Sequence, residues 1–138
     1  MALFSIFEVG GSALNAQNVR LNTIASNMAN AGSVAGSAEQ AYKSRQPVFA
    51  SVYNQELFGN DAQLPVRVTG IVESQAENPK RYEPDNPMAD EQGYVWQSNV
   101  NIIDEMTNMM VASRNYENSI EMLNTTKELL LSTLRLGE

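Results

Sequence analysis

The sequence contains no cysteine and no histidine, and these two absences exclude much of protein chemistry. Without cysteine there are no disulfides and no thiolate nucleophiles, and without either residue the usual zinc sites cannot form. Acid–base catalysis by an imidazole is also excluded. Because most familiar enzyme classes depend on one of these groups, we predict that the protein is not an enzyme and has no catalytic residue, cofactor or metal.

Basic residues are scarce, with nine Lys and Arg against sixteen Asp and Glu and a formal net charge of -7. No run of basic side chains could follow a phosphate backbone, so nucleic acid is not an expected partner. Long apolar runs are missing too, and the first thirty residues hold one basic side chain, Arg20. This segment is typical of neither a cleavable signal peptide nor a membrane span, and we expect no direct membrane insertion.

What the chain does contain is apolar residues at helical spacing near its C-terminus. Residues 100–136 lack proline, Asn101 is suited to cap a helix, and Gly137 follows the segment. Large side chains recur in alternating steps of four and three, the spacing of a coiled-coil seam. The predicted seam runs through Ile102, Met106, Met109, Ser113, Tyr116, Ile120, Leu123, Lys127, Leu130 and Leu134. So narrow a seam on a long helix needs a packing partner.

Residues 2–31 show the same rhythm and are the candidate partner. Their stripe comprises Leu3, Phe7, Gly10, Leu14, Gln17, Leu21, Ile24, Met28 and Ala31. The Gly10-Gly11 pair weakens this helix, because each glycine costs roughly 1 kcal/mol relative to alanine. The sequence leaves open whether the pair breaks the helix or marks a close approach between two backbones.

The middle of the chain is predicted to be short strands and loops. A loop is expected at 30–41, and strands at 42–53 and 65–74 with a turn at Gly59-Asn60-Asp61. Residues 76–99 contain three prolines and are expected to be extended. Tyr94, Val95 and Trp96 end that connection in a short strand or an anchoring contact.

These patterns together predict a mainly α fold with a small β-rich middle. The N- and C-terminal helices are expected to pair as a coiled coil. Residues 1–32 and 99–137 would form one discontinuous coiled-coil domain, and 33–98 a loop and short-strand region.

The acidic residues permit two chemical interpretations. Asp85, Asp90 and Glu91 could form a calcium site. Their segment lacks the alternating oxygen ligands and the glycine of an EF-hand loop, so a solvated loop is favoured. Glu73 with Glu77, or Glu83 with Asp85, could be the carboxylate pair of a glycosidase. Sixteen acids in a short chain make such neighbours common, and no aromatic sugar platform is evident.

Longer motifs resemble a known family. Ser12-Ala13-Leu14, Arg20-Leu21-Asn22 and the run from Ala25 through Asn27, Met28 and Asn30 to Ala31 resemble the N-terminal signature of bacterial flagellar rod and hook proteins. Residues 100–137, with Ala112-Ser113-Arg114-Asn115-Tyr116-Glu117, resemble their C-terminal signature. The short length, the opening Leu3-Phe4-Ser5-Ile6-Phe7, and 82–87 followed by Gly93-Tyr94-Val95 are similar to the C-type proximal rod subunits.

This resemblance implies a structural subunit of the flagellar proximal rod, the drive shaft of the basal body, that polymerises through its terminal helices and transmits torque. It implies a helical tube made with itself and other rod proteins, and contact with the MS-ring junction protein at the rod base. It also implies passage through the flagellar type III export apparatus without cleavage of a signal peptide, and a place in the rod within the periplasm.

The residues expected to carry packing and assembly are Phe7, Leu14, Leu21, Ile24, Asn27, Met28, Asn30, Met106, Met109, Tyr116, Ile120, Leu123, Leu130 and Leu134. Two alternatives stay open at this point. One is another rod or hook subunit, although those chains usually carry larger insertions in the middle. The other is a helical-hairpin adaptor that binds one partner helix.

Overall fold

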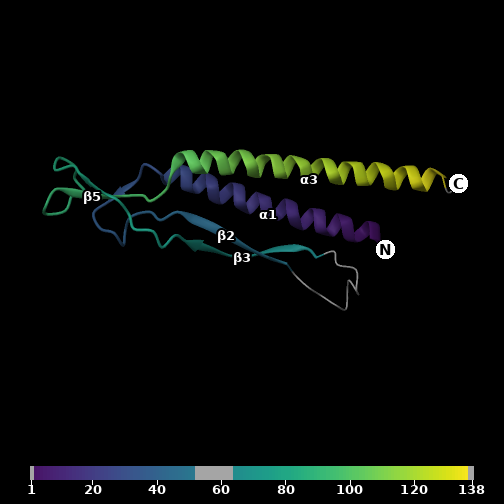
Figure 1. Ribbon diagram of the computed structural model, residues 1–138, viewed down its shortest axis with the longest axis horizontal. Helices are drawn as coiled ribbons and strands as arrows, with labels where there is room; N and C mark the ends of the chain where they lie inside the picture. The colour runs from purple at the N-terminus through teal and green to yellow at the C-terminus, as the bar shows by residue number, and fades with distance from the viewer. Residues whose placement is uncertain (1, 52–63, 137–138) are drawn as a thin grey trace.

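Two long helices lie side by side in a computed structural model that describes residues 2–51 and 64–136 (Figure 1). Helix α1 spans Ala2–Asn30 and helix α3 spans Ile102–Leu136, and they run antiparallel. The C-terminal end of α3 extends beyond the start of α1 (Figure 1). The prediction of two terminal helices is confirmed. Neither has the combination of length and apolar character that crossing a membrane requires.

The helix ends follow from local sequence. Asn101 caps α3, because its Oδ1 accepts a hydrogen bond from the Ile103 N–H at 3.0 Å. Asp104 and Glu105 occupy the first turn and Arg135 the last, where the helix dipole favours charges of these signs. At the other terminus α1 passes through Gly10 and Gly11 without a break.

A β-hairpin packs along α1. Strand β2 (Arg45–Ser51) pairs antiparallel with β3 (Val66–Glu73), with a register shift between Val48 and Phe49 that leaves Thr69 without a partner residue. The Thr69 hydroxyl donates to the Val48 carbonyl at 3.1 Å, which gives that carbonyl a partner at the bulge. Both predicted strands are confirmed within a few residues. The predicted turn at 59–61 lies outside the described residues.

A three-stranded sheet closes the end where α1 stops and α3 begins (Figure 1). Its order is β1 (Val34–Ala35), β5 (Tyr94–Gln97) and β4 (Lys80–Tyr82), all antiparallel neighbours. The strand expected at 94–96 is therefore confirmed, with Val95 fully buried. The two outer strands have no signal in the sequence, because one has two residues and the other is mostly basic.

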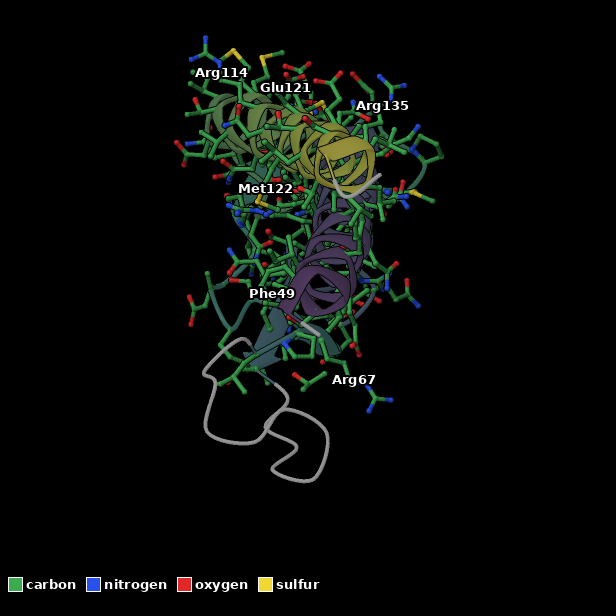
Figure 2. The ribbon with its side chains drawn as sticks, turned by 90° about the vertical axis from the view of Figure 1, so that its right-hand side faces the viewer. Phe49, Arg67, Arg114, Glu121, Met122 and Arg135 are labelled. Atoms are coloured by element: carbon green, nitrogen blue, oxygen red, sulfur yellow. The ribbon has the colours of Figure 1, made fainter. Side chains whose placement is uncertain are left out.

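Where the hairpin lies along α1 the molecule has three layers, with α1 in the middle (Figures 1 and 2). Helix α3 covers one side of α1 and the β2–β3 hairpin covers the other. This leaves α1 one narrow exposed stripe, made of Glu8, Gly11, Asn15, Asn18, Asn22, Ala25 and Ala29. The buried apolar core is small and rich in alanine: Ala16, Ile24, Ala35, Ala41, Val95 and Ala112.

Candidate assembly surface

Asn27 joins the end of α1 to Arg45, the first residue of β2. Its side chain is 1% exposed, and its Oδ1 accepts hydrogen bonds from the Arg45 N–H at 2.9 Å and the Tyr42 hydroxyl at 3.0 Å. Its Nδ2 donates to the Arg45 carbonyl at 2.8 Å. Since both backbone groups of Arg45 bond to one carboxamide, Asn27 takes the place of a neighbouring strand at this edge of the hairpin.

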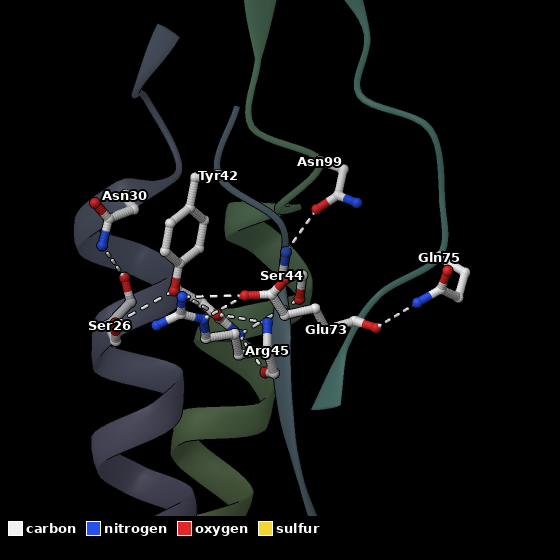
Figure 3. Close-up of polar contacts among 9 residues, drawn as sticks. Ser26, Asn30, Tyr42, Ser44, Arg45, Glu73, Gln75 and Asn99 are labelled. Atoms are coloured by element: carbon white, nitrogen blue, oxygen red, sulfur yellow. Dashed lines mark hydrogen bonds and ion pairs between the residues drawn. The ribbon is translucent and has the colours of Figure 1, made fainter. Parts of the chain in front are cut away.

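Two more asparagines extend this junction to the connection before α3. Asn99 accepts a hydrogen bond from the Ser44 N–H at 2.6 Å (Figure 3). Its Nδ2 donates to the Ala76 carbonyl at 2.9 Å. Asn78 donates to the carbonyls of Tyr42 and Gln97 at 2.9 and 2.8 Å. The junction therefore holds α1, both sheets and the start of α3 together through side-chain amides.

The sequence prediction named Asn27 but missed Asn78 and Asn99. Both lie in a segment whose prolines predict loop, and asparagine is common in loops for unrelated reasons. Asn30, also predicted, has a more local role: its Nδ2 donates to the Ser26 carbonyl at 2.8 Å, and the Ser33 hydroxyl and N–H donate to its carbonyl. It ends α1.

Helix α3 packs on α1 through a stripe in which small or polar residues alternate with large ones. Among the described elements α1 is its only packing partner, so the covered side chains of α3 mark the contact. They follow a 4-3 spacing through Glu105, Met109, Ala112, Tyr116, Ser119, Leu123, Thr126 and Leu130. Leu123 lies directly over Gly10 in an unbroken helix, so the close contact is between the Gly10 backbone and a leucine side chain, and not between two backbones.

The residues of the predicted α3 seam differ in exposure: some are half-buried and others are exposed. Met109, Tyr116, Leu123 and Leu130 are half-buried. Met106, Ile120 and Leu134 are exposed, at 51%, 38% and 64%. Met106 lies on the predicted seam but outside the contact with α1. The contact uses positions 105, 112, 119 and 126, each one residue before a position of the predicted seam, and it shares 109, 116, 123 and 130 with that seam. Its centre is therefore rotated about the helix axis by about 50° from the centre of the predicted seam, half of the angle between successive residues.

The predicted residues of α1 are all covered. Ile24 and Asn27 are buried, and Phe7, Leu14, Leu21, Met28 and Asn30 are half-buried. Because α1 is in contact on two sides, its covered surface is wider than one seam. The 4-3 spacing identified residues that are covered but did not indicate which neighbour covers each.

Rotation of α3 leaves two apolar flanks outside the contact with α1. By helical periodicity the first flank holds Ile102, Ile103, Met106, Met110, Ile120, Leu131 and Leu134, and the second holds Val111, Met122 and Leu129. Each lies about 100° from the α1 contact. Arg114, Glu121 and Arg135 point outward from α3, away from α1 (Figure 2). The exposed side of α3 therefore combines charged positions with two apolar flanks.

The acidic loop forms a turn in this structure. Asp90 Oδ1 accepts from the N–H groups of Gln92 and Tyr94, both at 2.9 Å. The hydrogen bond from Tyr94 is the main cause that lowers the pKa of Asp90 below its ordinary value. Over residues 2–51 and 64–136, no three acidic side chains converge in a way that could hold a metal ion.

Comparisons with protein families and with individual proteins all identify similarity to flagellar basal-body rod proteins. Residues 7–36 match the family described as flagella basal body rod protein, and residues 91–136 match the C-terminal family of flagellar basal body rod FlgEFG proteins. Over the full length of both chains, the sequence is 48% identical to flagellar basal-body rod protein FlgC of Salmonella typhimurium and 47% identical to that of Escherichia coli O6:H1. It is 37% identical to FlgC of Buchnera aphidicola subsp. Acyrthosiphon pisum, again over both full lengths.

Proposed function

The chain belongs to the family of flagellar basal-body rod proteins FlgC, and from this premise we propose that it is a structural subunit of the proximal rod that joins its neighbours through the outer faces of its terminal helices. The relatives are named as rod proteins, and a structural role fits a chain without cysteine or histidine. In this role the subunit would transmit torque along the rod.

The assembly surface is proposed from one observation: large apolar side chains of α3 are not covered by the part of the chain that the structure describes. Ile103 is 74% exposed and Leu134 is 64% exposed. Full burial of one such side chain is worth about 1.5 to 3 kcal/mol, so two flanks of them supply a large driving force for association. Contiguous apolar surface of this kind on a soluble chain marks an interaction site.

The arrangement of the subunit in the rod follows from the same premise. We infer that residues 1–32 and 99–137 act as one discontinuous helical unit, paired as a coiled coil and packed against copies of itself and other rod proteins in a helical tube. Residues 33–98 would lie outside it. The proposed contacts also include the MS-ring junction protein at the base of the rod.

The route to this location is part of the proposal. We propose that the subunit passes through the flagellar type III export apparatus without signal cleavage and joins the rod within the periplasm. The scarcity of long apolar runs and the absence of cysteine are consistent with export of an unfolded chain through a narrow channel.

A substitution on the first flank tests the assembly surface. Ile120→Asp places a charge on the first flank, at a residue that is 38% exposed, and should prevent incorporation into basal bodies while the free subunit keeps its helical circular dichroism. Ile120→Leu is the matched control and should incorporate normally. Leu123→Asp should instead damage the subunit itself, because Leu123 packs on Gly10. Normal incorporation of Ile120→Asp in purified basal bodies would contradict the proposal.

A further inference from the structure

A groove lies where α1, α3 and β2 meet, and it contains a buried carboxylate that lacks a donor. The groove has a volume of about 280 Å³ and is lined by Arg20, Ile24, Arg45, Gln46, Pro47, Phe49, Glu105 and Asn108. Glu105 is 6% exposed, and its buried Oε2 has no hydrogen-bond partner within the described part of the chain. An unpaired polar atom in this position is costly, and most buried polar atoms in folded proteins have a partner.

The charges around the groove restrict what could supply the donor. Arg45 is paired with Glu73 at 3.1 Å, whereas Arg20 has no ion pair among the described residues. A further cation would enter a groove that already has two arginines on its wall, and an anion would face Glu105. A neutral carboxamide suits both groups, because its NH₂ donates to a carboxylate and its oxygen accepts from a guanidinium.

The second flank of α3 presents two such carboxamides. Asn115 and Asn118 are exposed and lie at 4-3-4 spacing between Val111 and Met122. If the apolar residues of this flank become buried against a neighbour, the two amides become buried with them and need polar partners. A lone asparagine in an apolar stripe is known to fix the register of helix packing in this way.

We propose that the Glu105 groove receives the carboxamides of Asn115 and Asn118 from a second copy of this chain and thereby sets the register between adjacent subunits. The proposal rests on the proposed function, since it needs a neighbouring copy. Rotation about the last side-chain bond of Glu105 exchanges its two oxygens, so either can face the incoming amide. On assembly the Glu105 carboxylate then gains a donor, which the described part of the free subunit does not supply to its Oε2.

The first test compares Glu105→Gln with Asp104→Asn in a flagellated bacterium that lacks its own copy of this subunit. Both substitutions remove one negative charge from the first turn of α3, but Asp104 is exposed. Glu105→Gln should lower incorporation into basal bodies about tenfold or more, the effect of losing a charge-assisted hydrogen bond, and Asp104→Asn should have little effect. The urea midpoint of the free Glu105→Gln subunit should be unchanged or raised. Equal incorporation of the two variants, or a lowered midpoint, would overturn the proposal.

The second test identifies the occupant by disulfide cross-linking, which the cysteine-free chain permits without background. Asn108→Cys on the groove wall is combined with Asn118→Cys or, as the control, with Asn124→Cys on the opposite flank. Mild oxidation of intact basal bodies should link the first pair into multimers and leave the control pair unlinked. Linkage of the control pair alone, or of neither pair in assembled rods, would overturn the assignment. If the unmodified chain itself fails to incorporate, the proposed function fails and not merely this contact.

Discussion

Leu123 of α3 packs directly onto Gly10 of α1. A Cβ atom placed on Gly10 would lie 2.5 Å from Leu123 Cδ2 and 3.0 Å from its Cγ, closer than any ordinary contact. The adjacent Gly11 has no atom within 4 Å of the corresponding position. Two glycines next to each other in one helix therefore have different roles, and only the first is required by packing.

This difference predicts opposite outcomes for two matched substitutions. Gly11→Ala should stabilise the subunit by about 0.5 to 1 kcal/mol, because alanine is the better helix former and nothing blocks its methyl group. Gly10→Ala should be less stable than Gly11→Ala by about 1 kcal/mol or more, since Leu123 must move. Urea unfolding of the free subunit measures both. Equal gains from the two substitutions would show that Leu123 does not depend on Gly10.

Asn27 should be far more sensitive to substitution than other asparagines of α1. Asn27→Ala leaves the N–H and carbonyl of Arg45 without their partner, and we expect a loss of about 2 to 4 kcal/mol of unfolding free energy. Asn22→Ala, on the exposed stripe, should change it by less than about 0.5 kcal/mol. Hydrogen exchange at the Arg45 amide should accelerate in Asn27→Ala. A small effect at both positions would rule out the junction as a main source of stability.

The C-terminal end of α3 should be the least protected part of that helix in the free subunit. Among the side chains of α3 that the structure describes, Leu130 is the last one that is not exposed, and the C-terminal end of α3 extends past the start of α1 (Figure 1). Amide exchange after residue 130 should therefore be fast in the free subunit, slower between 105 and 126, and slow along the whole helix in assembled rods. Uniform slow exchange to the C-terminus in a verified monomer would contradict the need for a neighbour.

The turn at Asp90 should lose order at low pH. Its pKa is lowered from about 3.8 because the charged form accepts backbone hydrogen bonds, first of all from Tyr94. A depressed carboxyl pKa contributes stability that is present above 3.8 and is lost as the pH falls through the lower folded value. The amide resonances of Gln92 and Tyr94 should therefore titrate with a midpoint below 3.8. In Asp90→Asn this titration should vanish, and its persistence would assign it to another group.

Several elements of the fold could be predicted because their signals are local. The cap at Asn101, the uninterrupted periodicity of 100–136 and the alternation in β2 and β3 depend on residues close together in the chain. By contrast, β1 and β4 form because two short segments, distant from each other in the sequence, pair with the two edges of β5. Their few residues carry no pattern of their own. The roles of Asn78 and Asn99 likewise depend on carbonyls and N–H groups that only the fold brings near.

The sequence by itself determined that both ends of this chain are helical and that each carries side chains in a repeating four-and-three rhythm. Only the tertiary structure decided which face of α3 contacts α1. The sequence period fixes the spacing of the residues in a stripe, but it does not fix the rotation of the helix about its own axis relative to α1. Close packing against α1 selected Ala112, Ser119 and Thr126, whose small size lets the two backbones approach, and turned Met106 and Ile120 outward. The apolar residues that the sequence suggested for the interior of one subunit are thus available to its neighbours.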